Sequence, residues 1–309
     1  MEFGIGALSA IGACFFTNPL EVVKTRFQLQ GELRKRGQYT VHYKNFLHAG
    51  YIIAKTEGIL ALQKGLVPAL YHQVLLNGVR LGGYQIAEEK NLYKKKNGEV
   101  SLLNTIAIGG VMGVAGAYAG SPLQLMKIRL QAQSAESIAV GTQHSVSGTF
   151  DALKQICKSE GFFGMWKGVV GSVPRLSVGS ASQLGTFYLA KEFLATNSYY
   201  QVAPGLLNTF LSSMMGGVVV AITMGPLDVI STRLYNQGYD PQGRGLLYSG
   251  YFDCVSKMWT TEGFRGFYKG IVPCYMRIGP HTVLCFVFWD ELKKVHQKLV
   301  RPEKRLVIP

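Results

Sequence analysis

A short segment that begins with proline occurs three times along the 309-residue chain. The copies span Pro19–Arg26, Pro122–Arg129 and Pro226–Arg233, and each follows a run of apolar and small residues. About a hundred residues separate consecutive copies, so the period fills the chain and predicts three similar parts rather than unrelated domains. The predicted parts are residues 1–98, 99–203 and 204–300, followed by a C-terminal tail at 301–309.

The composition favours a membrane protein with an anionic partner. Hydrophobic residues make up 48% of the chain and charged residues 16%, below the roughly 25% typical of soluble domains. The formal net charge of +14 favours an acidic solute, an anionic lipid or a nucleic acid. The sequence contains no basic cluster interleaved with aromatic residues, so we do not expect nucleic acid. The five cysteines have no CxxC or paired spacing, which predicts free, buried thiols and no metal site.

Two long apolar segments in each repeat are suited to cross a bilayer, whose hydrocarbon core is about 30 Å thick. The first long helix of repeat one is expected to continue through Pro19, which should kink it. The predicted long helices cover about residues 3–26 and beyond, 66–93, 102–133, 170–195, 205–236 and 271–299, with short interfacial helices at 43–56, 149–159 and 251–261. The sequence therefore predicts an all-α membrane protein of six transmembrane helices in three pseudo-symmetric repeats, with both termini on one side.

Small residues recur at four-residue steps before each proline, in the same register in all three repeats. Such stripes allow helix backbones to approach closely in lipid. They consist of Gly6, Ala10, Cys14 and Asn18; Gly109, Gly113, Ala117 and Ser121; and Ser213, Gly217, Ala221 and Gly225.

A second motif follows each short helix: Glu-Gly, then four residues, an aromatic residue and Lys-Gly. It is complete at residues 160–168 and 262–270, whereas repeat one has Gln63 at the aromatic position. Together the two motifs resemble the mitochondrial carrier family (solute carrier family 25) over essentially the whole chain. The segment Arg277–Leu284 is similar to the oxoglutarate and oxaloacetate carriers of that family. The resemblance implies a multi-pass protein of the mitochondrial inner membrane, the mitochondrial carrier fold, and termini that face the intermembrane space.

In the first proline segment an acid and a base, Glu21 and Lys24, occur three positions apart, so they lie near one helix face. The resemblance implies a matrix gate in which the acid of one repeat pairs with the base of the next. The predicted pairs are Glu21 with Lys127, Gln124 with Ser231, and Asp228 with Lys24. The middle pair is neutral because both of its charges are replaced. Solvated charges in interfacial turns are the alternative interpretation. The resemblance also implies that Gln28, Gln131 and Tyr235 brace these pairs.

A cytoplasmic gate is implied on the even-numbered transmembrane segments, and only its third copy keeps the family pattern. Its residues are Gln85, Glu88, Tyr188, Lys191, Asp290 and Lys293. The implied pairs are Gln85 with Lys191 and Tyr188 with Lys293, while Asp290 would face Glu88 as a like charge. We therefore expect a weak cytoplasmic gate and a cytoplasm-open state in the absence of substrate.

Cationic side chains occur at one depth of the predicted bundle, seven residues after each Lys-Gly pair. These residues are His72, Arg175 and Arg277, and eight residues further on stand Arg80, Gln183 and Cys285. An arginine within an apolar helix is costly unless it lines a wet cavity, and its planar donors suit carboxylate or phosphate. The predicted substrate-binding residues are His72, Arg80, Arg175, Gln183 and Arg277. Alternatives are a packing role for His72 and a surface-directed Arg80 side chain.

The predicted function is transport of a small anion by alternating access, with antiport implied by the resemblance. Candidate substrates are a dicarboxylate or keto acid such as oxaloacetate, sulfate and phosphoenolpyruvate. A proton or anion uncoupler and a non-transporting scaffold or insertion factor are the alternatives. The chain has no catalytic motif, no cofactor is expected, and a monomer is expected. The resemblance implies that the bound anionic lipid is cardiolipin. The predicted lipid-binding residues are Lys64, Gly65, Lys167, Gly168, Lys269 and Gly270.

Overall fold

The computed structural model describes residues 2–35, 37–94, 101–196, 206–240 and 242–300, and helices dominate this part of the chain. Six of these helices are long. They are α1 (Glu2–Leu29), α3 (Leu66–Glu89), α4 (Leu102–Ala132), α6 (Val169–Thr196), α7 (Leu206–Asn236) and α10 (Ile271–Val300). Helices α1, α4 and α7 continue through their internal prolines. The positions of the predicted long helices are thus confirmed to within a few residues.

Four spans in the described residues are long and apolar enough to cross a membrane. They are Ile59–Glu89, Leu103–Ala132, Met214–Asn236 and Phe264–Val295, which correspond to α3, α4, α7 and α10. The other two long helices, α1 and α6, each contain 28 residues. Composition and length therefore support four of the six predicted crossings among the residues that the structure describes.

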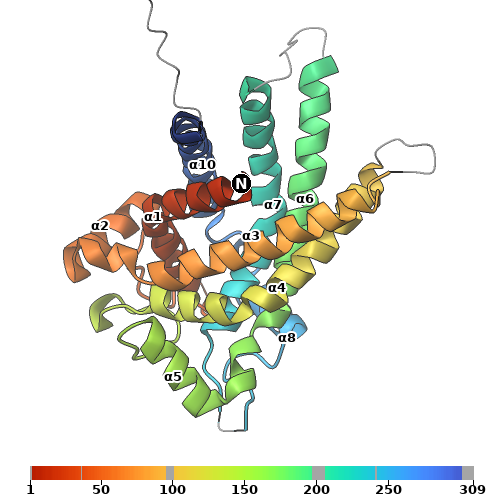
Figure 1. The fold of residues 1–309 in the computed structure, drawn as a ribbon. Coiled ribbons are helices and arrows are strands. Elements are labelled where there is room, and N and C mark those ends of the chain that lie inside the picture. Colours follow the sequence, from red (N-terminus) through yellow and green to blue (C-terminus); the bar gives the residue numbers. More distant parts are fainter. Residues whose placement is uncertain (1, 36, 95–100, 197–205, 241, 301–309) are drawn as a thin grey trace, which may run out of the picture.

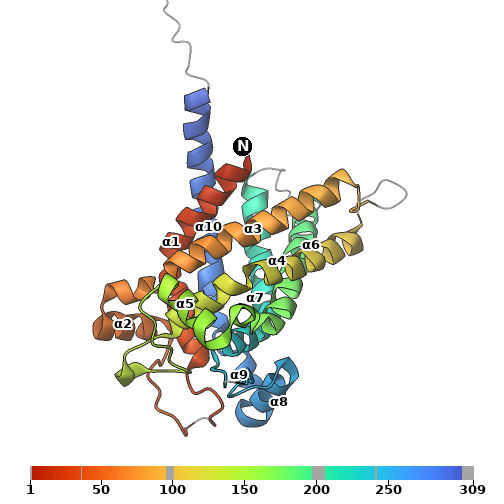
Figure 2. The same ribbon diagram turned by 60° about the horizontal axis from the view of Figure 1, so that its bottom comes forward.

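The long helices form a closed ring in chain order. Helix α1 packs on α3, the contacts continue through α4, α6 and α7 to α10, and α10 returns to α1 (Figure 1). Helix α1 begins, and α10 ends, at the same end of the molecule (Figure 2). Each half of a repeat thus contributes one helix to the ring, which brings the three proline segments together although they are distant in sequence.

Three short helices lie at the end of the molecule away from the start of α1 (Figure 2). They are α2 (Phe46–Glu57), α5 (Thr149–Glu160) and α8 (Tyr251–Glu262). Each packs an apolar face on the segment that follows the proline of its own repeat. In repeat one, for example, Ile53 of α2 lies in a fully buried cluster with Val23 and Leu29 of α1. Burial of such side chains contributes about 1.5–3 kcal/mol each.

One further turn, which the sequence analysis did not predict, follows each short helix. These turns are η1 (Ile59–Gln63), η3 (Phe162–Trp166) and α9 (Phe264–Phe267). They lie between the Glu-Gly and Lys-Gly pairs of the second motif. Glycines with positive φ at both ends, such as Gly161 (76°) and Gly168 (93°), turn the chain sharply there. The second motif is therefore the connection that leads the chain from each short helix into the next long helix.

The cysteine prediction is only partly right. All five cysteines are free, and Cys14, Cys254 and Cys274 are buried, but Cys157 is exposed and Cys285 is partly exposed. Cys157 lies on the solvent-facing side of the amphipathic helix α5, so helical periodicity places it away from the core.

The stripe of small residues permits close helix contact in repeat two. A Cβ atom built on Gly113 of α4 would lie 2.4 Å from the backbone oxygen of Leu176 in α6. A backbone atom cannot move aside as a flexible side chain can. The predicted close approach therefore depends on glycine at this position.

We expect Gly113→Ala to lower the melting temperature of the purified carrier in detergent, because the added methyl group must push α4 and α6 apart. Overpacking of this kind costs about 1–3 kcal/mol. Gly82→Ala in α3 is the matched control, since its Cβ would have no neighbour within 4 Å. Equal melting temperatures for the two variants in a thermal-shift assay would contradict the backbone contact.

Candidate functional site

Acidic and basic side chains of the three proline segments meet at one level of the helix ring. Lys24 Nζ lies 2.7 Å from Asp228 Oδ2, and Lys127 forms an ion pair with Glu21. The structure therefore contains both predicted ion pairs between successive repeats. We call the six residues of these positions the charge ring: Glu21, Lys24, Gln124, Lys127, Asp228 and Ser231. Its role as a gate stays a prediction.

The third position of the charge ring is neutral, and one oxygen atom of each of its two side chains has no hydrogen-bond partner among the described residues. Gln124 and Ser231 are both buried. Gln124 Oε1 and Ser231 Oγ form no hydrogen bond with any described residue. The ion pairs of the charge ring thus join repeat one to both other repeats. Among the described residues, no ion pair of the ring itself joins α4 of repeat two to α7 of repeat three.

Buried side chains one turn beyond the charge ring connect the repeats further. Gln28 Nε2 donates to Asp228 Oδ2 at 2.7 Å, and Gln28 Oε1 accepts from Thr232 Oγ1 at 2.9 Å. Gln131 accepts from Thr25 Oγ1 at 3.1 Å. The matching position of repeat three, Tyr235, lies 3.0 Å from Ser121 Oγ. The predicted bracing residues therefore contact neighbouring repeats, and Gln28 directly supports one ion pair of the charge ring.

A second set of ion pairs, which sequence reasoning missed, lies next to the charge ring, at the ends of the proline segments. In each repeat the glutamate of the Glu-Gly pair joins the arginine that ends the proline segment to the lysine of the Lys-Gly pair. These sets are Arg26, Glu57 and Lys64; Arg129, Glu160 and Lys167; and Arg233, Glu262 and Lys269. The signal was present in the sequence, because all three residue types recur in each repeat.

The lysines of the lipid-binding prediction take part in these ion pairs. Lys64 Nζ lies 2.8 Å from Glu57 Oε2, and Lys269 Nζ lies 2.9 Å from Glu262 Oε2. Lys167 is 3.6 Å from Glu160. Each ammonium group therefore has a carboxylate partner inside the protein, and its predicted contact with lipid stays a prediction. Burial alone would raise the pKa of Glu57 and Glu262, but the hydrogen bonds from arginine and lysine hold the pKa of both below the usual value.

We expect Glu262→Gln to destabilise the protein by about 3–5 kcal/mol, because the guanidinium of Arg233 is fully buried and would lose its counter-charge. Since the pKa of Glu262 is lowered by folding, its stabilisation is present above the unfolded pKa of about 4.3 and is lost as the pH falls through the folded value. Asp253→Asn is the control, because the ion pair of Asp253 with Lys257 is exposed. Equal melting temperatures would show that the buried pair is not stabilising.

Two predicted substrate-binding arginines lie against the acids of the charge ring. Arg175 Nη1 is 3.7 Å from Asp228 Oδ1, and Arg277 Nη1 is 3.4 Å from Glu21 Oε1. Both guanidinium groups keep a buried Nε without a hydrogen-bond partner in the described residues. Each arginine thus shares a carboxylate that already has a lysine partner, and each retains donors for another anion.

Arg80 and Gln183 form a second level, about two helical turns from His72 and Arg175 along their helices. Arg80 Nη2 lies 3.3 Å from Gln183 Oε1 and 3.4 Å from the hydroxyl of Tyr84. This contact joins α3 to α6, so the Arg80 side chain is directed toward α6 and not toward the surface as in the alternative interpretation. The structure therefore brings together Arg80 and Gln183, but it places them apart from the charge ring.

His72 is buried and packs against α4. It is 6% exposed, and a Cβ atom built on Gly120 would lie 3.0 Å from its imidazole ring. Close packing on α4 therefore helps to fix the position of His72, which agrees with the alternative of a packing role for this residue.

The family model of the mitochondrial carrier protein matches residues 1–95, 98–198 and 203–299. The chain belongs to the mitochondrial carrier family. It is 47% identical to solute carrier family 25 member 35 of Mus musculus over 298 residues, which cover 96% of this chain and 98% of that protein. It is 38% identical to the mitochondrial citrate transporter E of Aspergillus niger over 96% of this chain and 94% of the relative.

The chain is also 38% identical to the mitochondrial oxaloacetate transport protein of Saccharomyces cerevisiae, over 95% of this chain and 89% of the relative. Proteins of the mitochondrial carrier family reside in the mitochondrial inner membrane and transport small metabolites rather than catalyse reactions. The family assignment therefore agrees with the helical fold, the membrane-compatible helices and the threefold repeat of this carrier.

The predicted cytoplasmic gate of the carrier is only partly described. Gln85, Glu88 and Lys293 are exposed, and Gln85 Nε2 donates to Glu89 Oε1 at 3.1 Å within α3. The side chains of Tyr188, Lys191 and Asp290 lie outside the described residues. The like-charge contact between Asp290 and Glu88 therefore stays a prediction, while the described gate residues point to solvent.

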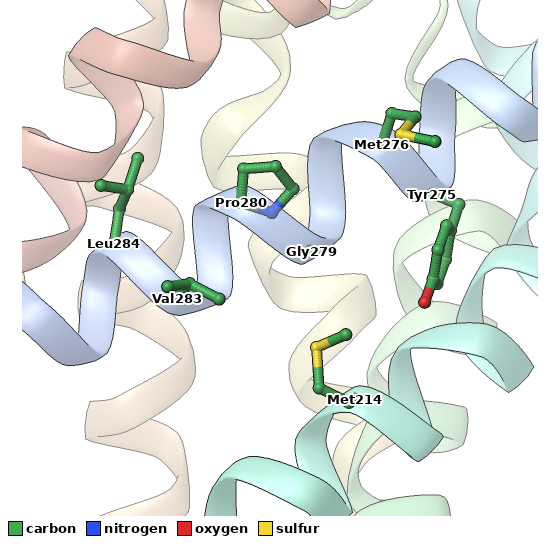
Figure 3. A pocket seen from close by; sticks show the side chains of 7 residues that line it. All are labelled: Met214, Tyr275, Met276, Gly279, Pro280, Val283 and Leu284. Atoms are coloured by element: carbon green, nitrogen blue, oxygen red, sulfur yellow. The ribbon is translucent and has the colours of Figure 1, made fainter.

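An apolar groove of about 490 Å³ lies between α7 and α10 (Figure 3). Met214 lines it from α7, and the other lining residues come from α10. These are Tyr275, Met276, Gly279, Pro280, Val283 and Leu284. None of them carries a charge, and none belongs to the predicted substrate-binding set. The groove is therefore unsuited to hold a small anion.

Proposed function

We propose that this carrier transports a small organic or inorganic anion across the mitochondrial inner membrane by alternating access, as an antiporter. The observation that carries the proposal is the arrangement of Arg175 and Arg277 beside the charge ring. The Nε of each has no hydrogen-bond partner among the described residues, and each guanidinium group contacts a carboxylate of the ring. Buried guanidinium groups within membrane helices mark a substrate pathway by default.

Competition for these arginines explains how an anion could loosen the closed end of the carrier. An anion that binds Arg175 and Arg277 replaces their contacts with Asp228 and Glu21. The two acids then retain only their lysine partners, and the charge ring is weakened on the side that faces the anion. Such a change requires that the anion bind the intermediate state more tightly than the closed state. The exposed gate residues at the other end are then free to approach one another.

The proposed substrates are a dicarboxylate or keto acid such as oxaloacetate, sulfate or phosphoenolpyruvate. Planar guanidinium groups bind carboxylate and phosphate oxygens in pairs, which suits each of these anions. The names of the yeast and Aspergillus relatives, an oxaloacetate and a citrate transporter, support an organic acid. Arg80 and Gln183 are proposed to meet the anion before it reaches the deeper pair.

We also propose that cardiolipin binds where α3, α6 and α10 begin. The glycines that precede these helices have positive φ values of 73°, 93° and 96° at Gly65, Gly168 and Gly270. Free N–H groups at a helix start can donate hydrogen bonds to a phosphate. Because the neighbouring lysines are paired with glutamates, the backbone would supply most of this contact. The carrier is proposed to act as a monomer, with both termini facing the intermembrane space.

Exchange in proteoliposomes tests the proposed function. Purified carrier is reconstituted with internal oxaloacetate, malate, sulfate or phosphoenolpyruvate, and uptake of a radiolabelled external anion is followed together with internal pH. We expect uptake that requires an internal anion. Proton conductance without anion exchange would instead support the uncoupler, and the absence of both activities would support a scaffold or insertion factor.

A further inference from the structure

The three predicted substrate-binding residues that lie seven positions after a Lys-Gly pair have equivalent positions relative to the charge ring. Arg175 is seven residues after the Lys-Gly pair of repeat two and contacts Asp228, two residues after the proline of repeat three. Arg277 holds the same position in repeat three and contacts Glu21 of repeat one. The register therefore sets the third such residue, His72, opposite Gln124 of repeat two.

Contacts around His72 support this placement. The ring packs on Gly120 of α4, which is one turn before Gln124 on the same helix. Lys127 of α4, Arg175 of α6 and Glu21 of α1 are the charged groups that act on the ring from neighbouring helices. His72 thus lies between the substrate level and the neutral position of the charge ring.

We call His72, Gln124 and Ser231 the His72 sector of the site. All three residues differ in charge from the residues at the equivalent positions of the other repeats. The acid is replaced by Gln124, its basic partner by Ser231, and the arginine above them by His72. All three side chains are at least nine-tenths buried, and Gln124 Oε1 and Ser231 Oγ have no hydrogen-bond partner in the described residues. The site consequently has two charged sectors and one sector of neutral polar groups, in which two oxygen atoms have no hydrogen-bond partner among the described residues.

We propose that this carrier selects anions that carry two anionic groups and, between or beside them, a neutral hydroxyl or carbonyl group that the His72 sector binds. This inference rests on the proposed function and adds a substrate class to it. Arg175 and Arg277 each take one anionic group. The neutral group bonds to the imidazole of His72 or to Gln124, which can donate or accept.

A third anionic group is disfavoured at this depth. It would lie among His72, Gln124 and Ser231, while the nearby cations Lys127 and Arg175 are already paired with Glu21 and Asp228. Arg80 is on the same helix as His72, but it is two turns away and is engaged with Gln183 and Tyr84. A buried charge without a partner is costly, whereas a neutral group that completes unused hydrogen bonds is favourable.

Initial exchange rates of the reconstituted wild type test the inference. The probes are oxaloacetate and malate, succinate as the dicarboxylate that lacks the neutral group, and citrate as the tricarboxylate. We expect kcat/KM for oxaloacetate or malate to exceed that for succinate by about tenfold, the value of one hydrogen bond in a buried site. Equal rates with succinate, or a preference for citrate, would overturn the inference. Exchange of none of the four would overturn the inference, and exchange of sulfate or phosphoenolpyruvate would then decide the proposed function. Unselective exchange of the four would overturn the inference and leave the proposed function intact.

A charged third sector should change the selectivity. The triple variant His72→Arg/Gln124→Glu/Ser231→Lys restores an arginine above an ion pair, as in the other two sectors. We expect the citrate-to-malate ratio of kcat/KM to rise at least about tenfold, because the third carboxylate gains a guanidinium partner. The ratio is compared because an added ion pair slows the exchange of every anion. An unchanged ratio in a folded variant would contradict the assignment, and the wild-type rates decide the matter if the variant does not fold.

Discussion

Arg175→Ala and Arg277→Ala are each expected to lower anion exchange at least about 100-fold, because loss of a guanidinium removes a charge-assisted pair of hydrogen bonds from the bound anion. The effect should exceed that of any other single truncation of the site, since both groups lie beside the charge ring and keep unpartnered donors. Initial rates of radiolabelled anion exchange in proteoliposomes give the measurement.

Two controls separate binding from folding in this experiment. Asp228 and Glu21 retain Lys24 and Lys127 as partners in the variants, so the melting temperature should fall little. Arg265→Ala removes an exposed arginine and should exchange anions at the wild-type rate. If Arg175→Ala or Arg277→Ala kept wild-type exchange, these residues would not belong to the substrate site.

Introduction of a third ion pair into the charge ring is expected to have the second largest effect on the rate of anion exchange. The double variant Gln124→Glu/Ser231→Lys should slow exchange by about 10- to 100-fold, because a third buried pair must break whenever this end opens, at a cost of about 1.5–3 kcal/mol for a charge-assisted hydrogen bond. The pair would join α4 to α7, which the present ring leaves without an ionic contact at this level. The same pair should raise the melting temperature.

The single variants supply the control for this prediction. Gln124→Glu alone and Ser231→Lys alone each bury one charge without its designed partner, so each should lower the melting temperature. Faster exchange or a lower melting temperature for the double variant than for both single variants would show that Gln124 and Ser231 do not face each other across the ring.

Helices and repeats of this carrier follow directly from the sequence, because their signals are local and occur three times. Apolar runs set the long helices, and the proline segments set their register. The ion pairs of Lys24 with Asp228 and of Lys127 with Glu21 also follow, since a ring of three equivalent repeats brings each acid to the next base. These pairs are present in the structure.

The contacts of the second motif could not be predicted in the same way. Lys64 and Lys269 were expected to bind an anionic lipid, and their ion pairs with Glu57 and Glu262, which the turn after each short helix makes possible, were not expected. That turn depends on glycines with positive φ, whose conformation a helical pattern does not reveal. Arg26 was overlooked because its partner, Glu57, is distant in sequence and lies on a different helix.

The substrate site is an intermediate case. Counting from the Lys-Gly pair placed Arg175 and Arg277 at one depth, and the structure brings both to the charge ring. The count did not show that they touch its acids, because that contact joins helices of different repeats. The packing of His72 against Gly120 also depends on the approach of α3 to α4, which no single segment specifies.

Charge-selective labelling of a cysteine at Gln183 tests most directly whether fixed positive charge lines a wet path for anions. Gln183 is exposed and lies 3.3 Å from Arg80, so Gln183→Cys would place a thiol beside a guanidinium in a background without native cysteines. We expect a negatively charged methanethiosulfonate to react at least about tenfold faster than a positively charged one, and a transported anion to slow the reaction. Equal rates for the two reagents, or no reaction with either, would contradict the account.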